Sequence, residues 1–94
     1  MGSLGSAYAA LGEARRAIEF YEQRLVIARA MGDRRWEALV CWNMGCEYAN
    51  LGDLSRAAEL MQVLVDYERE IGHADAEKHA AVVAALRAQL RGSP

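Results

Sequence analysis

The side chains best able to do chemistry in this chain of 94 residues are two cysteines and two histidines. Cys41 and Cys46 lie five residues apart on a segment whose pattern predicts a helix, so their thiols point in different directions and cannot form a disulfide. His73 and His79 are out of phase with both cysteines. Because a metal site needs three or four converging ligands, this set predicts no bound metal.

A cysteine nucleophile requires a neighbouring base, and none lies at helical spacing on the face that carries Cys46. We interpret Cys46 as a small, buried or half-buried apolar residue. The acidic run Asp66, Glu68 and Glu70 is interpreted as a solvated helix face. The sequence has no nucleophile–base pair and no Gly-rich phosphate loop. It predicts no enzyme and no cofactor; a thiol-dependent enzyme resting on Cys46 is the remote alternative.

The elements that must position these side chains come from an internal repeat. A shift of forty residues aligns Leu4-Gly5-x-x-Tyr8-Ala9-x-Leu11-Gly12 with Met44-Gly45-x-x-Tyr48-Ala49-x-Leu51-Gly52. Eight of the sixteen positions between residues 4 and 19 are identical to the position forty residues on. A fixed period of about 20–50 residues is typical of repeat proteins, whose stacked units form extended binding surfaces.

Glycine punctuates the repeat every twenty residues, at Gly12, Gly32, Gly52, Gly72 and Gly92. Glycine just past a helix end adopts the left-handed conformation that stops the helix. The spacing therefore predicts five helices, over about 3–11, 14–31, 34–51, 54–71 and 75–91. Apolar residues recur within them at steps of three and four, as amphipathic helices require.

Composition bounds the class of protein. At 53% apolar, with one proline and few β-branched residues, the chain is predicted to be a single all-α domain. A net charge of -2 gives no electrostatic basis for binding nucleic acid. No apolar stretch approaches the roughly 20 residues that cross a membrane, so no membrane contact is expected. The free thiols and the lack of a signal peptide predict a cytoplasmic location.

These residues resemble the tetratricopeptide repeat, a pair of antiparallel helices with small and large residues in a fixed order. The second unit supplies Met44-Gly45, Tyr48, Leu51-Gly52-Asp53, Ala57 and Met61, and the first supplies Leu4-Gly5, Tyr8, Leu11-Gly12-Glu13, Ala17 and Tyr21. In this pattern Gly5 and Gly45, with Ala17 and Ala57, are expected to let the paired helices approach closely, and Tyr8 and Tyr48 are expected to fill the space beside them. Cys41 and Arg24 depart from the pattern, standing where the family prefers Trp and Ala. The period of forty, rather than about 34, resembles the long repeats of kinesin light chain and of many bacterial signalling proteins.

The resemblance implies an α-solenoid of two antiparallel helix pairs plus a C-terminal capping helix. We expect one domain over 1–94, with repeat 1 at 1–33, repeat 2 at 34–73 and the capping helix at 74–91. Only about nine residues of the first helix of repeat 1 precede Gly12. The chain is therefore expected to be a fragment of a longer array, shortened at its amino end.

The first helices of such repeats line the concave face of the superhelix, where partners bind. On this register the predicted protein-binding residues are Leu39, Trp42, Asn43, Cys46, Asn50, His79, Val82, Val83 and Leu86. Trp42 is the central candidate, because Trp is enriched among binding hot spots. The competing interpretation is that Trp42 packs between repeats as part of the core.

The leading hypothesis is a module that binds a protein or peptide partner in its concave groove. The alternative is self-association, because the shortened first repeat is expected to leave part of the helix over 14–31 without cover, at Phe20, Leu25 and Ile27. Two copies could then pair end to end or exchange helices into a homo-oligomer.

Overall fold

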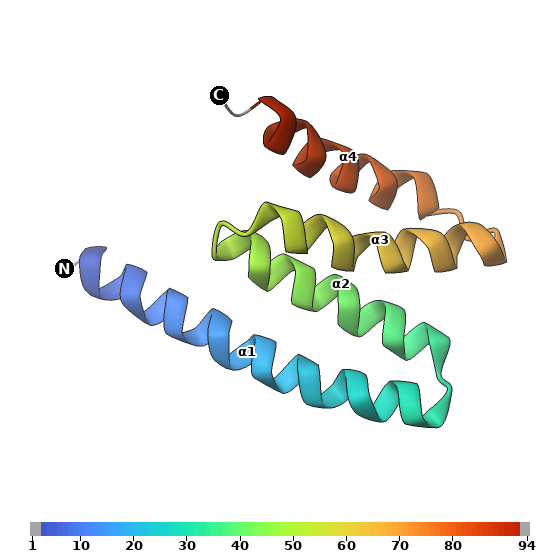
Figure 1. The fold of residues 1–94 in the computed structure, drawn as a ribbon, viewed down its shortest axis with the longest axis horizontal. Helices are drawn as coiled ribbons and strands as arrows, with labels where there is room; N and C mark the ends of the chain where they lie inside the picture. The colour runs from blue at the N-terminus through green and yellow to red at the C-terminus, as the bar shows by residue number, and fades with distance from the viewer. Residues whose placement is uncertain (1–2, 93–94) are drawn as a thin grey trace.

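The computed structural model describes the backbone of residues 3–92 and the side chains of residues 12–92. Four helices make up this part of the chain: α1 (Ser3–Met31), α2 (Arg34–Asn50), α3 (Leu54–Ile71) and α4 (Ala76–Gly92). They run antiparallel in chain order, and each packs mainly on its neighbours in sequence (Figure 1). This is the all-α arrangement of a helical repeat, in which each element packs on the next.

The expectation of five helices is wrong, because α1 continues through Gly12 and joins the two segments predicted at 3–11 and 14–31. The turns after α1, α2 and α3 each hold a glycine with positive φ, at Gly32, Gly52 and Gly72. Gly12 is not among them. The expected antiparallel pair of repeat 1 is therefore one straight helix in this structure (Figure 1).

The residue after each glycine explains the difference. Asp33 and Asp53 follow Gly32 and Gly52, and their carboxylates accept the amide protons of Trp36 and Arg56, at 2.9 and 3.1 Å. These bonds satisfy amides that the start of a helix leaves free. Glu13 stands at the matching position after Gly12. Glu is a good helix former and is not among the preferred N-cap residues, so nothing at 12–13 starts a new helix.

Two groups of buried side chains hold the helices together. The α1–α2 cluster contains Ile18, Val40 and Met44. The α3–α4 cluster contains Ala58, Met61, Val65 and Val83. Both groups stabilise the array by removing apolar surface from water, at roughly 25 cal/mol per Å².

Gly45 allows α2 and α3 to approach closely, as the sequence predicts. A Cβ atom at this position would lie 2.8 Å from Met61 Cγ and 3.0 Å from the Ala57 carbonyl oxygen. The corresponding expectations for Gly5 and Tyr8 in repeat 1 concern side chains outside the described part of the structure.

The forty-residue repeat is also visible in the contacts. Arg29 Nε lies 3.0 Å from Glu37 Oε2 across the α1–α2 turn, and Arg69 Nε lies 3.1 Å from Glu77 Oε1 across the α3–α4 turn. Each residue of the second pair stands forty positions after its counterpart in the first. Within residues 3–92, no helix combines the length and the apolar character needed to cross a membrane.

Candidate functional site

Trp42 lies where α2 reaches across to α4. Its indole is half-buried against the α3–α4 cluster. The ring also packs on His79 of α4, with centroids 4.7 Å apart and planes inclined at 52°. Trp42 thus has a core contact and a solvent-facing remainder, and both interpretations made from the sequence describe part of its environment.

The other predicted binding residues fall into three groups by exposure. Leu39 and Val82 are exposed apolar side chains, at 42% and 41%. Asn43 and Asn50 are exposed polar ones, whereas Cys46, His79 and Leu86 are half-buried. Val83 is only 2% exposed and belongs to the core, so it supports the surface from beneath and offers no contact to a partner. Four exposed residues and three half-buried ones form what we call the α2–α4 surface, comprising Leu39, Asn43, Asn50 and Val82 with Trp42, His79 and Leu86.

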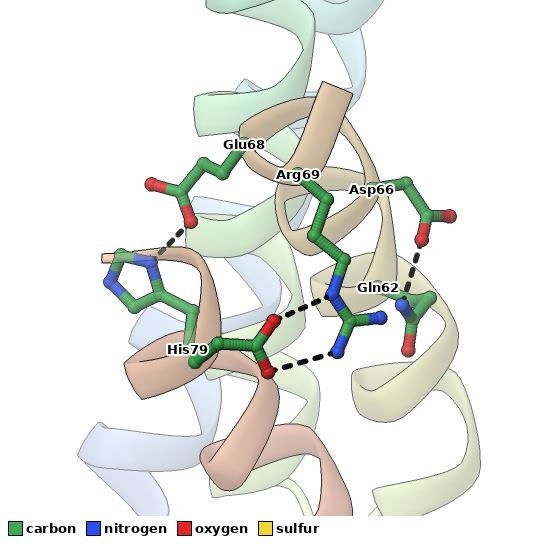
Figure 2. A network of polar contacts seen from close by, with 6 residues as sticks. Gln62, Asp66, Glu68, Arg69 and His79 are labelled. Atoms are coloured by element: carbon green, nitrogen blue, oxygen red, sulfur yellow. Dashed lines mark hydrogen bonds and ion pairs between the residues drawn. The ribbon is translucent and has the colours of Figure 1, made fainter. Parts of the chain in front are cut away.

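A buried carboxylate fixes His79 in place. Glu68 of α3 is 6% exposed, and its Oε1 lies 2.6 Å from His79 Nδ1. Because an ionised carboxylate only accepts hydrogen bonds, Nδ1 carries the proton that joins them. Figure 2 shows the two side chains facing each other across the α3–α4 junction, with Arg69 beside them. Glu68 therefore orients the imidazole on which Trp42 packs.

His73 is a weaker partner of the same carboxylate. Its Nδ1 lies 3.6 Å from Glu68 Oε2. The same nitrogen accepts the amide proton of Asp75 at 3.0 Å, so it holds a lone pair there and has no proton to donate to Glu68. Of the two imidazoles, only that of His79 hydrogen-bonds to Glu68.

The matching position in the first repeat carries an apolar pair. Forty residues before Glu68 and His79 stand Ala28 and Leu39. Ala28 is fully buried, as Glu68 nearly is. One repeat thus carries two apolar side chains at these positions, and the next carries a hydrogen-bonded carboxylate and imidazole. Both residue combinations are compatible with the fold, because neither leaves a buried polar group without a hydrogen-bond partner.

The interpretation of Glu68 as part of a solvated acidic face is wrong. Asp66 and Glu70 are exposed, but Glu68 lies on the buried stripe of α3. The signal was present in the sequence, because Glu68 stands four residues after Leu64 and three after Val65, both buried. Helical periodicity at this position outweighs residue type.

The two thiols lie in environments that oppose ionisation. Cys41 is fully buried and Cys46 is half-buried. Burial raises the pKa of both thiols above the ordinary cysteine value. Since the thiolate is the reactive form, neither cysteine is activated as a nucleophile. Among residues 12–92, no three His, Cys, Asp or Glu side chains converge as metal ligands would.

Parts of this chain are similar to known proteins. A family model described as tetratricopeptide repeat matches residues 1–35. Over 59 residues the chain is 41% identical to the human protein named G-protein-signaling modulator 1. That match spans 63% of this chain and 9% of the length of the relative. No solved structure matches. The matches support the tetratricopeptide resemblance and say nothing about the forty-residue type of repeat.

Proposed function

We propose that this chain is a protein-interaction module, which holds a helix or extended segment of a partner against the α2–α4 surface. The observation that carries the proposal is that Leu39 and Trp42 of α2 and Val82 of α4 are apolar and in contact with solvent. Trp42 joins these two helices through its contact with His79 of α4. Trp42 is oriented by its contact with His79, so an incoming side chain would meet a prearranged aromatic surface.

The chemistry of the surface favours a partner with an apolar stripe. Asn43 and Asn50 flank the apolar residues with exposed amides, which can bind backbone groups of a bound segment. The tetratricopeptide match supports a binding role over catalysis, as do the raised pKa values of the two thiols. The similarity to a protein named as a modulator of G-protein signalling supports a regulatory repeat region within a larger signalling protein.

The test is selection of binding peptides from a displayed random library, followed by comparison of two matched variants. Val82→Asp places a charge on the α2–α4 surface, and Val63→Asp places one in the hollow that α3 forms with Arg34 and Ala38 of α2, at a similar exposure of 36% against 41%. We expect selected peptides to lose at least tenfold in affinity for Val82→Asp and to bind Val63→Asp as they bind the parent. Equal effects of the two changes would contradict the proposal.

Trp42→Ala is a poorer first test, because the indole also covers the α3–α4 cluster. Its truncation is expected to lower stability by about 3 kcal/mol. A lower affinity of this variant would then reflect partial unfolding as well as lost contacts with the peptide. Val82 is more exposed, so its replacement separates the two effects.

A further inference from the structure

One face of α1 is open although its counterpart in the next repeat is covered. Gly45 of α2 packs on the side chains of Leu60 and Met61 and on the Ala57 backbone. Ala57 and Met61 are 0% and 4% exposed as a result. Leu64, one turn further on, is 4% exposed. This face of α3 is the surface on which the first helix of repeat 2 is seated.

Forty residues earlier, the same positions on α1 form what we call the Phe20 surface: Ala17, Phe20, Tyr21 and Arg24. Phe20 is 49% exposed, Arg24 is exposed, and the other two are half-buried. The Phe20 ring meets Tyr21 edge to face at 5.8 Å, and the Arg24 guanidinium lies 4.7 Å from its centroid. The Phe20 surface, with its two aromatic rings and one cation, is thus open at the position where the matching surface of repeat 2 is covered by a helix.

The residues that match this covering helix are 4–11, and Gly5 is the counterpart of Gly45. Within one chain they cannot reach the Phe20 surface while α1 is continuous. Residues 5 and 20 are fifteen positions apart on one helix, about 22 Å at 1.5 Å per residue. Figure 1 shows the amino-terminal part of α1 projecting past the α2–α3 turn.

We propose that residues 4–11 of a second copy dock on the Phe20 surface, and that the exchange is reciprocal. Two α1 helices would then cross antiparallel, with Gly5 of each copy at Ala17, Phe20 and Tyr21 of the other. The midpoint between positions 5 and 20 falls at residues 12 and 13, so the two-fold axis passes beside Gly12. A Cβ atom added at Gly12 would meet no described atom within 4 Å beyond the nearby backbone of α1, which leaves this surface free for the crossing.

This inference does not rest on the proposed function, because the Phe20 surface shares no residue with the α2–α4 surface.

The experiment measures molar mass by light scattering over a dilution series of the full chain. We expect the parent to approach twice its 10.4 kDa at high concentration. Phe20→Asp is expected to stay at the mass of one chain with unchanged helical circular dichroism. Val26→Asp is the matched control, because Val26 is a 68% exposed residue on another face of α1, and it should dimerise as the parent does. A parent that is monomeric at every concentration, or a Phe20→Asp variant that still dimerises, would overturn the proposal.

Two further variants separate exchange from other modes of pairing. A flexible Gly-Ser insertion between Gly12 and Glu13 would let residues 4–11 fold back on their own Phe20, and it should convert the dimer to a monomer. Gly12→Cys should form a disulfide-linked dimer on mild oxidation, whereas Arg35→Cys, at the far end of the array, should not. Dimers that persist with the insertion, or that cross-link equally at both positions, would show a different interface. Val82→Asp should leave the dimer intact, so failure here and failure of the proposed function are distinguishable.

Discussion

Replacing Glu68 and His79 together by the residues that repeat 1 carries should cost far less stability than replacing either alone. Glu68 is 6% exposed, and its Oε1 lies 2.6 Å from His79 Nδ1. His79→Leu leaves a buried carboxylate without its donor, which we expect to cost about 2 kcal/mol. Glu68→Ala removes a charge-assisted hydrogen bond and leaves a half-exposed imidazole, at about 1.5 kcal/mol.

The double variant reproduces the combination of Ala28 and Leu39 that stands at the matching positions of the first repeat. It leaves no buried polar group unpaired, so its stability should lie within about 0.5 kcal/mol of the parent. The coupling between the two changes is then about 3 kcal/mol in the double-mutant cycle. Urea denaturation followed by circular dichroism measures all four free energies of unfolding.

The exposed pair Arg69–Glu77 supplies the control, because it joins the same two helices at 3.1 Å in solvent. A cycle with Arg69→Gln and Glu77→Gln should show little coupling, as exposed ion pairs do. Additive effects of the Glu68 and His79 changes on the free energy of unfolding would refute this prediction. That result would mean the carboxylate and the imidazole do not depend on each other for burial.

Three other perturbations have expected outcomes of their own. Gly12→Ala should stabilise the chain by about 0.5–1 kcal/mol, whereas Gly52→Ala, at φ +84°, should destabilise it by about 1 kcal/mol or more. Thermal denaturation measures both changes, and a loss of stability with both variants would mean that residues 11–13 form a turn. Cys41 should react with a thiol reagent only on unfolding, because burial raises the pKa of its thiol; a rapid reaction in the native protein would contradict that packing. The Arg34 guanidinium hydrogen-bonds to Glu70 and lowers the pKa of that carboxyl, so the pair stabilises the fold above the ordinary carboxyl pKa of about 4.3 and loses this effect as the pH falls through the lower pKa. Any advantage of the parent over Glu70→Gln in urea should therefore be small at pH 6 and should shrink as the pH is lowered, and an advantage that grows on acidification would contradict this sign.

Much of the fold follows from the sequence because regularly spaced glycines mark the ends of the helices. Gly32, Gly52 and Gly72 end helices where their spacing predicts, and all three hold positive φ. The close approach at Gly45 also follows, since a small residue opposite Ala57 allows two helices to touch. These features are local, and local chemistry decides them.

The error at Gly12 shows that a glycine alone does not predict the end of a helix. A glycine permits a turn, but the capping carboxylate that follows it starts the next helix, and Glu13 does not supply one in the way Asp53 does. The expectation that Phe20 and Ile27 lack cover agrees with their exposures of 49% and 46%. Leu25 is half-buried beside the α1–α2 cluster, so it has partial cover.

The candidate site was less predictable, because it depends on contacts between helices. The register placed Leu39 and Trp42 on one helix and Val82 on the first helix of the next unit, and all three contact solvent. It gave no sign that His79 would be paired with a buried carboxylate. Residue type favoured an exposed Glu68, and only its position among Leu64 and Val65 indicated burial.

The central claim is that the α2–α4 surface holds the partner, and amide chemical-shift mapping of a selected peptide tests it most directly. The indole Nε1–H of Trp42 gives a resolved signal at the centre of that surface. We predict that titration of the peptide shifts this signal together with the amides of Leu39, Val82 and Leu86, while those of Val63 and Ile71 stay in place. Shifts confined to the outer faces of α1 and α3, with the Trp42 signal unmoved, would contradict the account.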